Sequence, residues 1–203
     1  MLKFAKDLYQ KISNFVDRIY WKTEVDFSRW ADNEELSIDV EKGNQYQPSF
    51  NNISKVLKKI QINKNDCIID IGCGKGKAMA VMRKYPFESV AGFDLSDEMV
   101  RVANSNFAKL KLENCKAFNA DAYTYSDYSK YKYIYMFNAV PLEVFKKTID
   151  NIILDKMIGN SFYFIYLNPM YHSLMLERGF KIVFVQNSII NWKKIIVYKF
   201  TKE

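Results

Sequence analysis

The sequence has few of the residues that build cross-linked or metal-bound small proteins. Among its 203 residues are one histidine and three cysteines, and the cysteines (Cys67, Cys73 and Cys115) form no CxxC pair. This pattern argues against a Cys/His zinc site and against a disulfide framework. Seven glycines and four prolines are too few for a collagen-like or low-complexity chain. We expect no bound metal and a cytoplasmic protein.

Long apolar runs are also missing. No run approaches the roughly 20 residues that cross a bilayer, and Lys3, Lys6 and Lys11 interrupt the apolar residues at the N-terminus. We therefore predict neither a transmembrane segment nor a secretory signal. A hydrophobic fraction of 49% and a charged fraction of 26% are typical of one soluble globular domain.

The net charge of +7 is unevenly distributed along the chain. Residues 1–22 carry five basic and two acidic side chains, residues 23–45 carry two basic and seven acidic ones, and the remainder is net positive. A basic body suits an anionic substrate or a membrane surface, although a solvated lysine-rich surface explains the charge as well. The change near residue 45 predicts an N-terminal helical extension or lid over 1–45 and a main domain over 46–203.

The N-terminal 20 residues have the pattern of an amphipathic helix. Its apolar positions recur at helical spacing: Leu2, Ala5, Leu8, Tyr9, Ile12, Phe15, Val16 and Ile19. Such a helix could make peripheral contact with a membrane through residues 1–20, hold a partner, or pack on its own domain. Packing on its own domain is the preferred interpretation at this point.

Beyond residue 49, apolar strand patterns alternate with helical ones. This order predicts an α/β fold with a doubly wound, mostly parallel sheet of about seven strands. The last two strands have little helical sequence between them, so we expect them to form an antiparallel edge. The expected strands are 67–71, 89–93, 115–119, 133–138, 161–167, 180–186 and 195–200, and the expected helices are 50–60, 75–84, 96–107, 142–156 and 171–177.

A glycine-rich turn, Asp-Ile-Gly-Cys-Gly-Lys-Gly over 70–76, joins the first strand to the next helix. It is one residue too short for a phosphate-binding P-loop, and Ala78 stands where that loop needs a hydroxyl. A dinucleotide fingerprint is a poor match, because its third glycine comes one residue early and Asp70 would face a pyrophosphate unfavourably. S-adenosylmethionine carries an ammonium group and no phosphate, so a carboxylate at this strand end suits it.

The turn resembles the glycine-rich motif of class I S-adenosylmethionine-dependent methyltransferases, which have a Rossmann-like fold. The resemblance assigns Asp70, Gly72, Cys73 and Gly74 to donor binding. It implies that Asp94, followed by Leu95, accepts the ribose hydroxyls, a charge-assisted arrangement. It also implies that Asp121 accepts from the adenine amino group and that the Ala122 N–H meets a ring nitrogen. The product would be S-adenosylhomocysteine.

Three further motifs resemble a small bacterial group within this family that shares the DIGCGKGK turn. They are Tyr46-x-Pro48, the strand ending in Asn138, and Tyr166-Leu-Asn168-Pro169. After Asn138 this chain has Ala-Val-Pro rather than the Pro-Phe of that group, which weakens any inference about the acceptor. Asn138 is a candidate for orienting the acceptor or the donor, and Tyr46 is a candidate for closing the site.

His172, the single histidine, follows the fifth strand and is the leading candidate for a general base. The predicted activity is O- or N-methylation of a small molecule or glycan precursor. Nucleic acid is a poorer candidate, because the chain has neither an Asn-Pro-Pro-aromatic motif nor a Pro-Cys pair. Protein-lysine methylation and a non-catalytic S-adenosylmethionine-binding role remain as alternatives.

Overall fold

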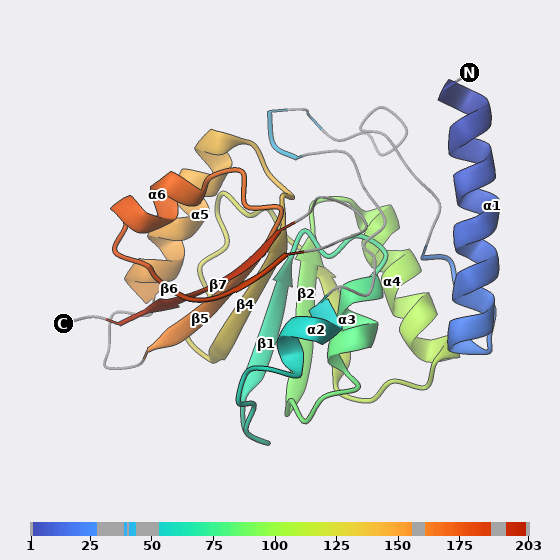
Figure 1. The fold of residues 1–203 in the computed structure, drawn as a ribbon, viewed down its shortest axis with the longest axis horizontal. Helices are drawn as coiled ribbons and strands as arrows, with labels where there is room; N and C mark the ends of the chain where they lie inside the picture. The colour runs from blue at the N-terminus through green and yellow to red at the C-terminus, as the bar shows by residue number, and fades with distance from the viewer. Residues whose placement is uncertain are drawn as a thin grey trace.

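The fold is taken from a computed structural model of the chain. It describes residues 2–27, 39, 41–43, 53–155, 161–187 and 194–201. The centre of the molecule is a seven-stranded sheet in the order β3-β2-β1-β4-β5-β7-β6 (Figure 1). The first five strands along the chain are parallel, and β7 is antiparallel to both β5 and β6. The strands are β1 (Cys67–Ile71), β2 (Ser89–Asp94), β3 (Cys115–Asn119), β4 (Tyr131–Phe137), β5 (Phe162–Leu167), β6 (Lys181–Gln186) and β7 (Ile195–Phe200).

Helices cover the two faces of the sheet and bury one apolar layer on each. Ile68, Ile165 and Val197 face α2, α3 and α4, whereas residues one position away, such as Ile69 and Ile196, face α5 and α6. The alternation of side chains along a strand produces these two layers. The helices are α1 (Leu2–Trp21), α2 (Ile53–Leu57), α3 (Lys77–Met82), α4 (Asp97–Lys109), α5 (Leu142–Asp155) and α6 (His172–Glu177).

The predicted doubly wound sheet is confirmed, including the antiparallel pairing of the last two strands. The main error is the helix expected over 75–84, which is only Lys77–Met82. Gly76 has a φ of 80° at the start of this helix, so Gly76 and the residue before it belong to the turn. In contrast, Ser96 caps α4 as its sequence suggested, because its hydroxyl accepts a hydrogen bond from the Met99 N–H.

The N-terminal helix is present, but its orientation differs from the preferred interpretation. Its apolar residues Leu8, Ile12 and Phe15 are exposed, while Asp17 is buried against Lys77. A pair of buried opposite charges therefore holds the polar side of α1 against the domain. No helix in the described ranges is long and apolar enough to span a membrane.

Strand order determines where a ligand would bind. The chain builds β1, β2 and β3 outward in one direction and then returns to place β4 on the other side of β1. In open α/β sheets, ligands bind at the carboxyl ends of the strands beside such a reversal. The glycine-rich turn follows β1 directly, so it lies at this position.

Candidate functional site: a donor-binding edge on β1, β2 and β3

The glycine-rich turn is fixed to the end of β2 through its backbone. The N–H groups of Gly72 and Cys73 both donate to the Phe93 carbonyl oxygen at 2.9 Å. Gly72 has a φ of 71°, and a Cβ added there would lie 2.2 Å from the Ala139 Cβ. Only glycine combines this backbone conformation with so close an approach of the loop that follows β4. The turn is thus tightly held between the end of β2 and the loop that follows β4.

Asp94 ends β2 and holds the turn from the other side. The Gly74 N–H donates to its Oδ2 at 2.8 Å, and the Ser96 N–H donates to its Oδ1 at 3.0 Å. Burial raises the pKa of the Asp94 carboxyl, and these backbone donors oppose that rise. A carboxylate has about four acceptor positions, and a third backbone donor, the Leu95 N–H, also lowers this pKa, so about one position remains for a ribose hydroxyl. The predicted ribose acceptor therefore also organises the turn.

Asp70 is buried in β1, with only 2% of its surface exposed. Burial raises the pKa of its carboxyl well above the usual range, and the negative charge of Asp94 raises it further. Within the described residues, no lysine, arginine or backbone N–H contacts this carboxylate. A buried carboxylate that lacks a protein cation is costly, and an ammonium group on a ligand would relieve that cost. Asp70 therefore fits the amino group of S-adenosylmethionine.

The segment after β3 supplies the third predicted contact. Asp121 uses Oδ1 to accept from the Tyr123 N–H at 2.8 Å, and its Oδ2 lies 3.9 Å from the Lys42 Nζ. Ala122 is buried, and its carbonyl oxygen accepts from the Thr148 hydroxyl of α5 at 3.0 Å. The backbone after β3 is thus held by a hydrogen bond from α5, and Lys42 from the N-terminal extension lies near Asp121.

Asn119 connects the second and third strand ends. Its amide nitrogen donates to the carbonyl oxygens of Asp94 and Leu95 at 3.2 and 2.9 Å. The structure therefore brings Asp70, the turn, Asp94 and Leu95 together, with Asp121 at the neighbouring strand end. The contact network of Asn119 was not anticipated, although its place before the predicted Asp121 was visible in the sequence.

The catalytic candidates are less closely grouped. Asn138 follows β4 with a φ of 42°, and the next residue, Ala139, contacts Gly72, so Asn138 lies beside the turn. Tyr46 lies outside the described residues. Its predicted role in closing the site stays a prediction.

His172 lies beyond β4 in the strand order, on the side away from β1. Its Nδ1 is hydrogen-bonded to the Tyr198 hydroxyl at 2.7 Å. Tyr198 is paired across β5 and β4 with Ile69, the residue before Asp70, so their backbones are three strand spacings, roughly 14 Å, apart. The structure places the imidazole against β7 rather than directly at the turn, and the role of His172 as a base stays a prediction.

Sequence reasoning missed the role of two lysines, one in the turn and one at the start of α3. Lys75 is bound by both carboxylate oxygens of Asp26 at 2.8 Å, and Lys77 is 2.8 Å from Asp17. Both lysines are almost completely buried. Asn106 of α4 strengthens the same contact by donating to the carbonyl oxygens of Asp26 and Lys75. The one signal in the sequence was the position of Asp17, opposite the apolar stripe of α1.

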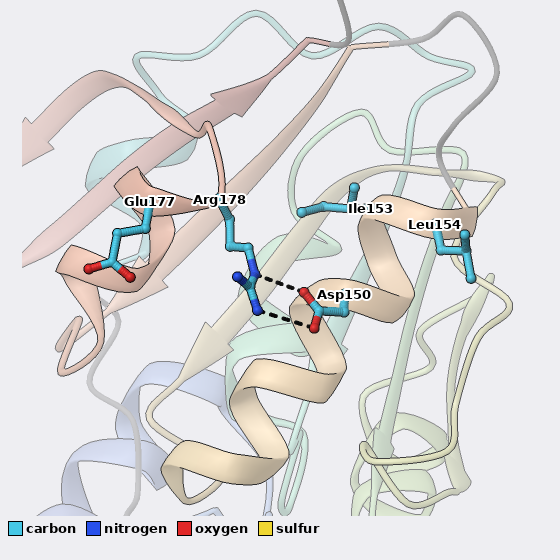
Figure 2. A pocket seen from close by; sticks show the side chains of 5 residues that line it. All are labelled: Asp150, Ile153, Leu154, Glu177 and Arg178. Carbon is cyan, nitrogen blue, oxygen red and sulfur yellow. Dashed lines mark hydrogen bonds and ion pairs between the residues drawn. The ribbon is translucent and has the colours of Figure 1, made fainter.

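A shallow hollow between α5 and α6 lies elsewhere in the molecule. Figure 2 shows the Arg178 guanidinium forming two hydrogen bonds with Asp150, at 2.8 and 3.2 Å, in a hollow also lined by Leu154. These residues lie toward the C-terminal ends of their helices, which run back to the amino edge of the sheet. The hollow is therefore separate from the donor-binding edge.

Comparison with known proteins agrees with this geometry. A family model described as a methyltransferase domain matches residues 68–155. The chain is 24% identical over 144 residues to a probable cobalt-precorrin-6B C(15)-methyltransferase (decarboxylating) of Methanococcus maripaludis, covering 68% of this chain and 76% of that protein. It is 26% identical over 127 residues to the 23S rRNA (uracil(1939)-C(5))-methyltransferase RlmD of Haemophilus influenzae. That match covers 60% of this chain but spans only 28% of the relative's length.

Solved structures show the same fold. A SAM-dependent methyltransferase from Aquifex aeolicus superposes with a TM-score of 0.57 and 16% identity, covering 71% of this chain and 87% of that one. An RNA methyltransferase from Salinibacter ruber, in complex with S-adenosyl-L-homocysteine, gives 0.59 and 10%, covering 77% and 95%. The strand order, the glycine-rich turn and the family match lead to one assignment. The chain carries a class I S-adenosylmethionine-dependent methyltransferase domain.

Proposed function

We propose that this protein transfers a methyl group from S-adenosylmethionine to an oxygen or nitrogen atom of a small molecule or glycan precursor. The observation that carries the donor assignment is the buried Asp70 carboxylate next to the glycine-rich turn. Its charge has no protein cation beside it among the described residues, and it needs one. Bound S-adenosylmethionine supplies an electrophilic methyl group on a sulfonium centre.

Each residue of the edge has a defined task in this proposal. Asp70 accepts from the donor ammonium, Asp94 accepts from the ribose hydroxyls, and Asp121 accepts from the adenine amino group. The backbone of Gly72 and Gly74 allows the methionine portion to approach the turn. These contacts fix the methyl group in line for attack, and such orientation supplies much of the rate in displacement reactions.

The cysteines argue against one carbon acceptor, the C5 atom of a pyrimidine. Methylation of a pyrimidine at C5 uses a cysteine nucleophile, and such a thiol must ionise readily. Cys67 and Cys115 are the first residues of β1 and β3, so both lie at the amino edge of the sheet. Cys73 is in the turn, but burial raises the pKa of its thiol well above the usual value. None of the three thiols both lies near the glycine-rich turn and ionises readily enough to act as that nucleophile.

The relatives support a small acceptor in preference to RNA. The cobalt-precorrin enzyme acts, by its name, on a small molecule, and this chain matches most of its length. The match to the rRNA enzyme is confined to little more than a quarter of that protein.

Two measurements test the proposal separately. Calorimetric titration should show S-adenosylmethionine binding that Asp94→Ala weakens by about 1–3 kcal/mol, the scale of hydrogen bonds to a charged group. The exposed Asp127→Ala variant is the control and should bind normally. Unchanged binding by Asp94→Ala would refute the donor site.

The acceptor is tested with a labelled methyl donor in a host-cell lysate separated into small-molecule, glycan, protein and nucleic-acid fractions. We expect label in the small-molecule or glycan fraction, and none when the Asp94→Ala variant is used. Label in protein or RNA would overturn the acceptor class and leave the donor assignment intact.

A further inference from the structure

The N-terminal helix turns its apolar side away from the domain. Leu8, Ile12, Phe15, Val16 and Ile19 are each between 49% and 63% exposed. Helical spacing places all five on one stripe, hereafter the α1 stripe. Figure 1 shows α1 at the outer edge of the molecule. Helices that only cover a domain bury such a stripe, so its exposure marks an interaction surface.

The outward orientation is imposed by contacts on the opposite side of the helix. Asp17, which is 2% exposed, pairs with Lys77, which is 6% exposed. Just after the helix, Asp26 pairs with Lys75, and Phe27 is fully buried against Trp21. Rolling the helix to bury the α1 stripe would leave Asp17 and Lys77 without each other, which is strongly unfavourable for buried charges.

Cations border the α1 stripe, and the described acidic side chains nearby are each paired with a basic one. Lys11 and Arg18 are exposed along one border, and Lys84 lies 4.1 Å from the centre of the Tyr20 ring at the other. The acidic groups Asp17, Glu24 and Asp26 are paired with Lys77, Arg18 and Lys75. Since Arg18 is neutralised by Glu24, the remaining exposed charge that borders the stripe among the described side chains is that of Lys11 and Lys84.

We propose that α1 docks this protein on an anionic lipid surface. An apolar stripe between cationic borders is the pattern of a helix that lies in the plane of a membrane interface. The stripe would enter the boundary between headgroups and acyl chains, and the lysines would remain among the lipid phosphates.

A second copy of the chain is a poorer occupant. Pairing two α1 helices would bring the positive borders of both together, and each chain already carries a net charge of +7. Like charges across an interface oppose association, whereas an anionic lipid surface attracts the same groups.

The docking is tested with the full chain and lipid vesicles. Vesicles of phosphatidylcholine alone are compared with vesicles in which about a third of the lipid is phosphatidylserine, at low and at high salt. We expect co-sedimentation with the anionic vesicles, weakened by salt. Phe15→Glu should reduce partitioning about tenfold or more, because it removes a large apolar group and adds a repelled charge. The double variant Phe15→Ser, Ile19→Ser should do the same without adding charge.

Leu154→Glu is the matched control. Leu154 is 68% exposed on α5, so it resembles Phe15 in exposure but lies outside the α1 stripe, and its substitution should leave partitioning unchanged. Circular dichroism verifies that each variant is folded. The proposal is overturned if the protein ignores anionic vesicles, or if Leu154→Glu impairs partitioning as much as Phe15→Glu. It is also overturned if light scattering shows a dimer that Phe15→Glu abolishes, because the stripe would then belong to a second copy.

Discussion

Replacing Asp70 with asparagine should stabilise the donor-free protein and weaken donor binding. The carboxylate is 2% exposed, and burial followed by the charge of Asp94 raises its pKa well above the usual range. The folded state therefore retains the proton to higher pH than the unfolded state. Between the two pKa values, stability falls as pH rises, and above the folded pKa the full cost of the buried charge remains. The neutral amide has no such cost.

The expected gain in stability and the expected loss of donor affinity both follow from the burial of Asp70. Relieving an uncompensated buried charge should contribute about 1–3 kcal/mol at neutral pH, and each kcal/mol raises the melting temperature of a chain of this size by about 2–4 °C. Loss of the ammonium contact should cost about 1.5–3 kcal/mol of donor binding, which is about 10- to 150-fold in Kd. The gain in stability should vanish at a pH below the unfolded pKa of about 3.9.

Thermal unfolding across pH, with and without S-adenosylmethionine, measures both effects in one experiment. Asp66→Asn is the matched control, because Asp66 is also buried but binds Lys132 at 3.0 Å and accepts from the Asn63 N–H. That variant should lose stability and keep its donor affinity. If Asp70→Asn instead melts earlier than the wild type, or binds the donor equally well, the ammonium assignment is wrong.

Three more predictions follow from single contacts. Asp17→Asn or Lys77→Met should each cost about 3–5 kcal/mol in urea unfolding, because one buried charge loses its partner, and the double variant should cost less than their sum. Gly72→Ala should weaken donor binding by an order of magnitude or more in calorimetry, since its positive φ is strained with a side chain. If His172 is the base, His172→Ala should lower kcat and leave donor affinity unchanged, and Tyr198→Phe should shift the pH profile of kcat; normal turnover in both variants rejects that role.

Local sequence signals were sufficient to predict most strands of the sheet. The run 67–71 is continuously apolar except for one residue and is bounded by polar segments, so both ends of β1 were predictable. The turn that follows was predictable from the sequence. Its backbone conformation requires glycines, and their spacing can be read directly. The helix after it was overextended by two residues at each end: Lys75 and Gly76 belong to the turn, and Arg83 and Lys84 follow the last helical residue, Met82.

Contacts between distant segments were not predictable. Asp17 and Lys77 are sixty residues apart, and buried lysines are exceptional, so no local pattern connects them. The hydrogen bond between His172 and Tyr198 depends on the antiparallel placement of β7 beside β5. Its location on the β7 side could not be inferred from the position of His172 after a strand alone.

The buried Asp17–Lys77 pair and the part-exposed Asp26–Lys75 pair explain why α1 has its orientation. A buried pair gains little stability over a well-packed apolar pair, so stability alone does not account for Lys75 and Lys77. The pairs do fix the rotation of α1 about its axis, because only one rotation brings Asp17 to Lys77. That rotation exposes the α1 stripe and attaches the helix to the same turn whose backbone borders Asp70 and Asp94. The Asp17–Lys77 pair therefore joins the helix that carries the stripe to the segment that follows β1, so docking of the stripe as proposed would also set the direction in which the predicted donor site faces.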